Sequence, residues 1–160
     1  MNAKNNPAPH PITRQVRFER VLDAPRALVW KAWTDPRHLA QWWGPHGFTN
    51  PVCKLAVRPG GSLRIVMRAP YGVDYPMTGV FHEVEKPGRL AFLSVAWDEN
   101  GGALLTSLAT ATFAAQGAKT KLTVLATAIG LVPVAKPMLG GMKVGWSQSL
   151  ERLAELVKTR

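Results

Sequence analysis

The sequence predicts an α+β fold in which a long C-terminal helix crosses the concave face of a curved antiparallel sheet of about seven strands, a helix-grip arrangement. Three features predict it: a strand-like segment followed by two short helical segments, a long middle region divided by turn signals, and a helical apolar stripe near the C-terminus. A half-buried sheet and an amphipathic helix each need a partner for one apolar face, so the last helix is expected to cover the sheet.

The first part of the domain is predicted to form one strand and two short helices. Residues 13–22 combine Val, Phe and Leu with Arg and Glu, which favours a strand with one solvated face. Pro25 suits the first turn of a helix, and apolar residues at helical spacing continue to about residue 34. The Asp-Pro pair at 35–36 is typical of a second helix start, and the Gly-Pro pair at 44–45 ends that helix.

The region from there to about residue 129 is predicted to form six strands. Turn signals recur at hairpin-like intervals, at 59–61, 70–72, 86–88, 99–102 and 116–117. Residues 61–69 alternate with a period of two, which is typical of an antiparallel sheet with one solvated face. A bulge near Gly79 would shift the register, so the face on which each side chain of the middle strands lies is left open.

An apolar stripe after Pro137 predicts one closing helix of about twenty residues. Its members are Met138, Met142, Trp146, Leu150 and Leu153. Gly140, Gly141 and Gly145 lie among them, and each glycine in a helix interior costs about 1 kcal/mol relative to alanine. Close packing, a bend, or room for another molecule would each account for these glycines.

Length and composition limit the class of protein. A chain of 160 residues is expected to form one domain, over residues 13–160, after a flexible tail over residues 1–12. The 46% apolar and 19% charged residues exclude an intrinsically disordered chain. Cys53 is the only cysteine, which excludes an intramolecular disulfide and, with no secretory signal at the start, favours a cytoplasmic location. The apolar stretches are too short to span a membrane.

The charge is strongly basic, with 20 Lys and Arg against 10 Asp and Glu and a net charge of +10. The basic residues are spread over the whole chain, and the sequence has no RNA-recognition signature. We therefore expect a solvated basic surface and no nucleic-acid partner.

Motifs for catalysis and for cofactors are few. The four histidines are dispersed without metal-ligand spacing, and the glycine pairs lack the Lys and Ser/Thr of a phosphate loop, so neither a metal nor a cofactor is expected. His82, on a predicted strand, is a candidate acid or base, although a lone strand histidine is more often solvated or hydrogen-bonded. Cys53 has no activating partner in the sequence and is interpreted as a small buried residue.

Several short motifs together carry a resemblance to a known family. They include Ala24-Pro25-Arg26, Val29-Trp30-Lys31-Ala32-Trp33, Thr34-Asp35-Pro36, Trp42-Trp43-Gly44-Pro45, Arg58-Pro59-Gly60-Gly61, Gly79-Val80-Phe81 and Gly141-Met142 with Gly145-Trp146. In their order and spacing, over about residues 16–157, the chain resembles the activator-of-heat-shock-ATPase homologue family within the START-like SRPBCC superfamily. The resemblance implies a START-like fold and, as in much of the superfamily, an apolar small molecule held between helix and sheet.

The leading hypothesis is that the protein binds an apolar or amphipathic small molecule, such as a lipid, in a cavity between the C-terminal helix and the sheet. Trp42 and Trp43 are adjacent on a short helix and cannot face the same way, so one is expected in the core and the other at the cavity. The candidate ligand contacts are Trp43, Met67, Tyr75, Trp97, Met142 and Trp146. Candidate polar lining residues are Tyr75, Thr78, His82, Ser94, Trp97 and Thr112.

Two other functions stay open. One is an enzyme of the polyketide-cyclase or aromatase kind, in which His82 or Tyr75 transfers a proton, although the sequence leans against catalysis. The other is a protein-interaction module of the heat-shock ATPase activator kind, which ranks below ligand binding because that activity belongs to longer proteins with an additional N-terminal region. The sequence does not choose between a monomer and a homodimer.

Overall fold

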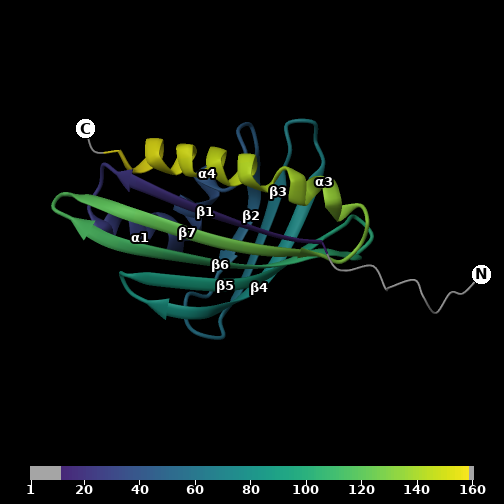
Figure 1. Ribbon diagram of the computed structural model, residues 1–160, viewed down its shortest axis with the longest axis horizontal. Helices are drawn as coiled ribbons and strands as arrows, with labels where there is room; N and C mark the ends of the chain where they lie inside the picture. Colours follow the sequence, from purple (N-terminus) through teal and green to yellow (C-terminus); the bar gives the residue numbers. More distant parts are fainter. Residues whose placement is uncertain (1–11, 159–160) are drawn as a thin grey trace, which may run out of the picture.

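The computed structural model describes residues 12–158, which form one seven-stranded antiparallel sheet and four helices (Figure 1). The elements in chain order are β1 (Ile12–Leu22), α1 (Arg26–Thr34), α2 (Pro36–Trp42), β2 (Thr49–Leu55), β3 (Ser62–Arg68), β4 (Asp74–Glu85), β5 (Arg89–Trp97), β6 (Ala103–Gln116), β7 (Lys119–Gly130), α3 (Ala135–Gly140) and α4 (Met142–Val157). The strand order in the sheet is β1-β7-β6-β5-β4-β3-β2, so only β1 leaves the meander, because it pairs with β7.

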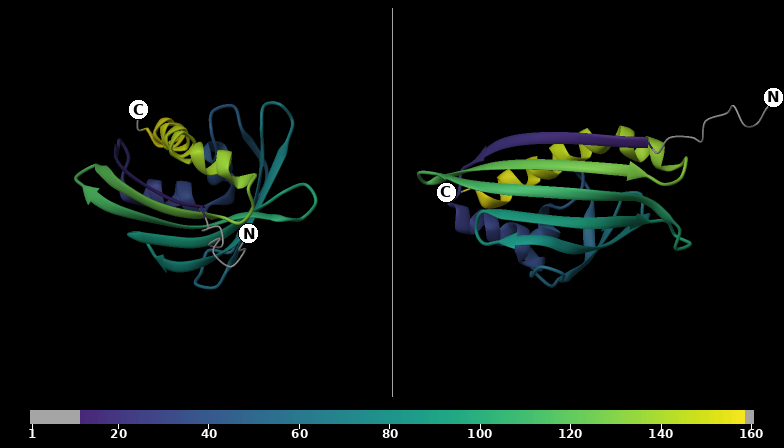
Figure 2. Two further views of the ribbon diagram at one scale, coloured as in Figure 1. Left: turned by 45° about the vertical axis from the view of Figure 1, so that its right-hand side comes forward. Right: turned by 60° about the horizontal axis from the view of Figure 1, so that its bottom comes forward.

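The sheet is curved, and the helices lie on its concave side (Figure 2). A bulge in β4 shifts its register against β5 between Phe81 and Glu83, and a second irregularity follows Ala96 in β5. Bulges increase the local twist of a strand and help a wide sheet to bend. The order of elements and the helix-grip arrangement predicted from the sequence are confirmed.

The two short helices begin where the sequence predicts. Pro25 is the N-cap of α1, in an extended conformation. The side chain of Asp35 caps α2 by accepting a hydrogen bond of 2.9 Å from the Arg37 N–H, and Pro36 follows at the first helical position. The Asp35 side chain thus satisfies an N–H group that the helix itself leaves without a partner.

The core lies between the three longer helices and the inner face of the sheet. Its buried side chains from the helices are Val29, Trp30, Ala32, Trp33, Leu39, Trp42, Leu150, Leu153 and Val157. Trp33 and Trp42 pack with their ring centroids 4.8 Å apart, and Trp33 also contacts Phe113 of β6 edge-on. This solid core occupies one end of the helix–sheet interface and leaves the other end to the site described below.

The C-terminal helix differs from the prediction. The sequence predicts one helix of about twenty residues after Pro137, whereas the structure has α3 and α4 separated at Gly141. Gly141 has φ −88° and ψ −1°, outside the usual α-helical values. Two consecutive glycines, Gly140 and Gly141, have the lowest helix propensity after proline, which accounts for the break at this point.

The expected tail over residues 1–12 lies outside the described residues except for Ile12, which begins β1. The helices of residues 12–158 are all too short or too polar to cross a lipid bilayer.

Candidate ligand-binding site

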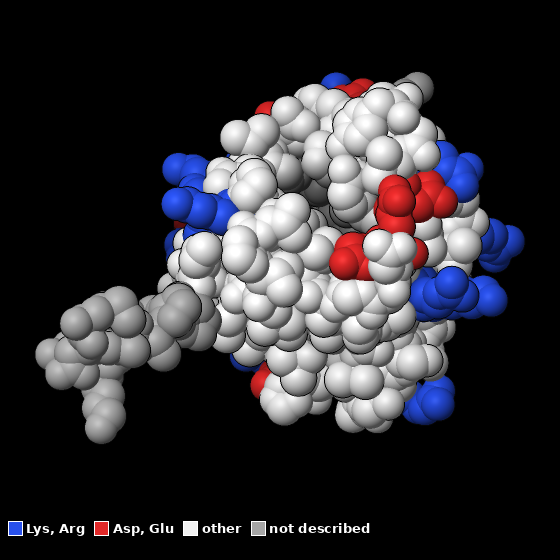
Figure 3. Space-filling view, turned by 90° about the vertical axis from the view of Figure 1, so that its right-hand side faces the viewer, with Lys and Arg blue, Asp and Glu red and all other residues white. Residues whose placement is uncertain are grey.

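A cavity of about 260 Å³ lies between the two C-terminal helices and the inner face of the sheet. Its walls come from the end of α2, from strands β3 to β7, and from α3 and α4. The residues that line it are Trp43, Gly44, Pro45, Met67, Met77, Phe92, Ser94, Ala96, Leu105, Ser107, Ala109, Ala128, Met138, Leu139, Gly141, Met142, Gly145, Trp146 and Ser149. Figure 3 views the molecule from the end that carries α3, where the surface is hollowed among mainly uncharged side chains.

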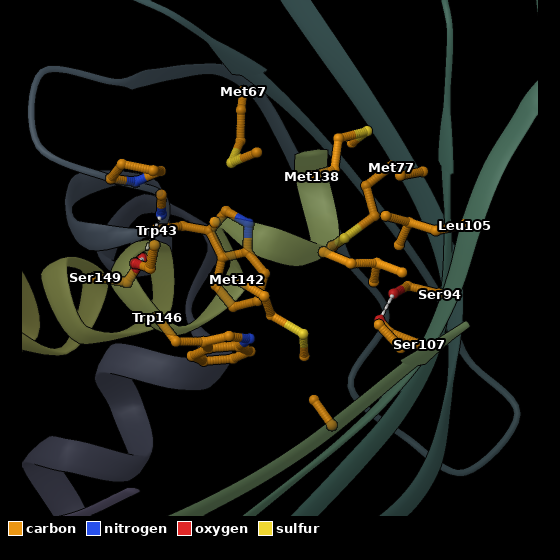
Figure 4. A pocket seen from close by; sticks show the side chains of 18 of the residues that line it. Trp43, Met67, Met77, Ser94, Leu105, Ser107, Met138, Met142, Trp146 and Ser149 are labelled. Carbon is orange, nitrogen blue, oxygen red and sulfur yellow. Dashed lines mark hydrogen bonds between the residues drawn. The ribbon is translucent and has the colours of Figure 1, made fainter. Parts of the chain in front are cut away.

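The roof of the cavity is formed by α4, through Met142 and Trp146 (Figure 4). Gly145 lies between them, and a Cβ atom added there would first meet Pro45 Cγ at 3.8 Å, an ordinary van der Waals distance. Close approach of another backbone therefore does not account for this glycine. Gly141 and Gly145 instead leave the roof without side chains at two positions along the cavity.

Aromatic rings form one wall. The ring centroids of Trp43 and Trp146 are 5.4 Å apart in an edge-to-face arrangement, and Trp43 lies 6.0 Å from Phe92 of β5. Trp42, the neighbour of Trp43, is fully buried in the core and donates its Nε1–H to the Ala32 carbonyl at 2.8 Å. The helix thus sends one tryptophan to the core and the other to the cavity.

Hydrogen bonds fix the wall that carries Trp43 to the roof helix. The guanidinium of Arg152 in α4 donates to four backbone carbonyls of residues 41–45, at 2.9–3.1 Å. Ser149 accepts from the Gly44 N–H at 3.1 Å and donates to the Gly145 carbonyl at 2.9 Å. Partial burial lowers the pKa of Arg152 from its usual value. These contacts hold the roof and the α2–β2 turn as one unit.

The floor is the inner face of the sheet, which carries methionines and two serines. Met67 and Met77 lie on β3 and β4, and their flexible thioethers fill irregular space. Ser94 of β5 and Ser107 of β6 are directly opposite in register, and their hydroxyl oxygens are 2.8 Å apart. Figure 4 shows this pair on the sheet side, across the cavity from the tryptophans.

The structure brings together four of the six candidate ligand contacts, namely Trp43, Met67, Met142 and Trp146. Tyr75 lies outside the lining: its hydroxyl is 2.8 Å from that of Tyr71, a hydrogen bond that raises the pKa of Tyr75. Trp97 donates its Nε1–H to the Thr78 hydroxyl at 2.8 Å and is also outside the lining.

Strand periodicity explains the position of Trp97. Phe92, Ser94 and Ala96 line the cavity, so Trp97 has the opposite parity on β5 and falls with Thr78 on the outer side of the sheet. His82 is exposed and is likewise absent from the lining. Among the candidate polar lining residues, only Ser94 reaches the cavity.

Sequence reasoning missed several lining residues. Phe92, Met77 and Ala109 were detectable, because they share the parity of neighbouring inward residues on their strands. The positions of Met138 and Leu139 in the lining depend on the break between α3 and α4, which the apolar stripe did not indicate.

The chemistry of the lining is uniform. None of the described residues that line the cavity carries a charged group or an imidazole. Residues 12–158 also contain no group of three His, Cys, Asp or Glu side chains that could hold a metal ion. Burial raises the pKa of the Cys53 thiol, on β2, to about 11, so this thiol is poorly nucleophilic at neutral pH.

Fold and cavity together define a helix-grip domain with an apolar pocket between its C-terminal helices and the sheet. The family model described as "Activator of Hsp90 ATPase homolog 1-like protein" matches residues 23–158, and the chain belongs to this family. This confirms the resemblance noted in the sequence. A comparison with curated proteins finds no match.

Many solved structures share the fold. Protein CV1439 from Chromobacterium violaceum is 28% identical, with a TM-score of 0.77 over 91% of this chain and 98% of its own. Protein NE0264 from Nitrosomonas europaea is 28% identical, with a TM-score of 0.73 over 90% of this chain and 94% of its own. A protein from Arthrobacter aurescens is 25% identical, with a TM-score of 0.75 over 89% and 85%.

Proposed function

We propose that this protein binds an apolar or amphipathic small molecule in the cavity beneath α4. The observation that carries the proposal is the cavity itself, about 260 Å³ in volume and walled by tryptophan, phenylalanine and methionine side chains. Ligand pockets are typically concave, mostly apolar and furnished with a few polar groups that set orientation. Trp43, Met67, Met142 and Trp146 are the proposed contacts.

The energetic cost of the cavity supports this function. At about 24 cal/mol per Å³, a dry and fully enclosed cavity of 260 Å³ would cost about 6 kcal/mol. Domains have only about 5–15 kcal/mol of net stability, so a space of this size would use much of it. A bound apolar molecule would restore the lost contacts. The volume of 260 Å³ is slightly below the usual range for ligand pockets, roughly 300–1,000 Å³, which favours a compact molecule over a long-chain lipid.

Native mass spectrometry of the protein purified from its own host tests the proposal. We expect one small molecule per chain, released by denaturing extraction. The variant Ala128→Leu, which fills part of the cavity, should lose the adduct while it stays folded. An adduct that persists in this variant would contradict the proposed site.

The same spectrum distinguishes a monomer from a homodimer. The cytoplasmic location stays a prediction that rests on the lone Cys53.

A second function, interaction with a chaperone ATPase, is favoured by the outer face of the sheet. Five aliphatic side chains are 38–44% exposed there: Val80, Leu93, Leu108, Leu125 and Ile129. Val80, Leu93 and Leu108 are direct neighbours across β4, β5 and β6. Exposed apolar patches of this kind often mark interaction surfaces. The test is whether the protein stimulates a purified Hsp90-type ATPase. Stimulation that Leu93→Lys abolishes and Ala128→Leu leaves intact would establish this function. No stimulation by the wild-type protein would exclude it.

The cyclase or aromatase alternative receives no such support. Tyr75 and His82, its candidate proton-transfer groups, are both outside the described lining of the cavity. An acid or base must lie within hydrogen-bond reach of the proton it transfers.

A further inference from the structure

The hydroxyl pair of Ser94 and Ser107 is a polar feature in an otherwise apolar part of the cavity. The two residues are opposite each other on β5 and β6, and their oxygens are 2.8 Å apart. Ser94 is only 5% exposed. Ala96, Leu105 and Ala128 also line the cavity close to the pair in sequence or register.

The pair cannot satisfy both of its own hydrogens. Each serine hydroxyl has one hydrogen to donate and two lone pairs to accept. In the bond between Ser94 and Ser107, one hydroxyl donates and the other accepts, whichever way the bond runs. The accepting hydroxyl keeps its own hydrogen. The pair therefore offers at least one O–H donor to a molecule in the cavity.

The third serine of the lining is different. Ser149 donates its hydrogen to the Gly145 carbonyl and accepts from the Gly44 N–H, so its donor is already used within the protein. The indole N–H groups of Trp43 and Trp146 donate to no residue within 12–158, unlike those of Trp42 and Trp97. The lining residues thus carry O–H and N–H donors that no residue within 12–158 uses.

The lining also excludes a charged occupant. No Lys, Arg or His is among the described lining residues to neutralise an anion, and no Asp or Glu to neutralise a cation. Moving an unpaired ionised group into an apolar site costs several kcal/mol. The net charge of +10 lies outside the cavity and cannot replace a local partner at hydrogen-bond distance.

Building on the ligand-binding function, we propose that the ligand is a neutral, compact molecule with a hydrogen-bond acceptor of the carbonyl or ether type, bound by the Ser94–Ser107 pair. Its apolar body packs against the wall formed by the rings of Trp43, Trp146 and Phe92. An apolar cavity of about 150 Å³ is enough for benzene. The present 260 Å³ therefore accommodates a single ring with a short side chain.

Three probes of matched size test this class by isothermal titration calorimetry on refolded, ligand-free protein. Propiophenone carries a ring and a carbonyl, butylbenzene has the same number of heavy atoms and no polar group, and 3-phenylpropanoate is an anion. We expect propiophenone to bind about fivefold more tightly than butylbenzene, the effect of one net hydrogen bond. The anion should bind at least about a hundredfold more weakly than propiophenone.

The double variant Ser94→Ala with Ser107→Ala removes both hydroxyls at once. Replacing both partners of a buried hydrogen bond by apolar groups is close to neutral for stability, so the variant should fold. Propiophenone should then bind no better than butylbenzene, whose own affinity should not fall. The control is Thr106→Ala, which removes a hydroxyl from the adjacent residue, on the outer face of β6. It should leave all three affinities unchanged.

The outcomes separate the two proposals. Equal binding of propiophenone and butylbenzene to the wild type, or an unchanged preference in the double variant, overturns the serine subsite and leaves the cavity function standing. Tightest binding of the anion overturns the neutral class. If none of the probes binds, the proposed ligand-binding function itself fails.

Discussion

Filling the cavity from β7 should make the protein more stable. Ala128 lines the cavity and is 3% exposed, yet it lies outside the contiguous cluster of buried core side chains. Ala128→Leu adds three carbons, and each buried methylene contributes about 0.8 kcal/mol, or about 2 kcal/mol for the three. After some loss to side-chain ordering, we expect a net gain of about 1–2 kcal/mol in the free energy of unfolding.

The matched control is Ala126→Leu, two residues earlier on the same strand and the same face. Ala126 is 1% exposed, belongs to the core cluster and does not line the cavity. Adding carbons to a well-packed core costs about 1–3 kcal/mol. The two substitutions are chemically identical, so only the space around each residue distinguishes their effects.

Urea denaturation of ligand-free protein measures both changes. The midpoint should rise for Ala128→Leu and fall for Ala126→Leu, with similar slopes. A fall of similar size for both variants would refute the reasoning, because it would mean that the space beneath α4 is as densely packed as the core.

Three further predictions concern single side chains. Arg152→Ala should lower the free energy of unfolding by about 2 kcal/mol, because it leaves four backbone carbonyls without a charged donor. Arg152→Lys should recover only part of this loss, because an ammonium group cannot reach all four carbonyls. Full recovery by lysine would contradict the role of Arg152 in binding the four carbonyls. The pKa of Cys53 rises from 9.0 to about 11 on folding, so the free energy of unfolding should fall as the pH rises from 9 towards 11. Urea denaturation at a series of pH values measures this fall. The fall should be smaller in Cys53→Ala. Propiophenone should quench the tryptophan fluorescence of the protein. Trp146→Phe should remove most of this quenching, because Trp146 lines the cavity. An equal reduction of the quenching in Trp97→Phe, outside the lining, would be inconsistent with the site.

The order of elements was predictable because it depends on local signals. Turn residues, the Asp35 cap and the alternation in residues 61–69 act through neighbours in the chain. The structure has β1, α1, α2 and β3 within a few residues of their predicted bounds. The break at Gly141 was not predicted. The apolar stripe continues through it, and only packing against the rest of the fold decides where a glycine pair interrupts a helix.

The site was partly predictable. Trp43, Met67, Met142 and Trp146 follow from helix geometry and strand parity. Tyr75 has an inward-facing neighbour at Met77 but lies farther along β4, where its ring is 6.3 Å from that of Phe48. How far a cavity extends along a strand depends on tertiary packing. The meeting of Ser94 and Ser107 depends on the β5–β6 register, which the sequence left open.

Xenon binding tests most directly whether the space beneath α4 is open to an apolar guest, because apolar cavities take up xenon without any specific contact. Crystals of ligand-free protein under xenon pressure should show a xenon atom bounded by Phe92, Ala128 and Met142. Crystals of Ala128→Leu should show less or none. Absence of xenon from this space in the wild-type protein would contradict the account.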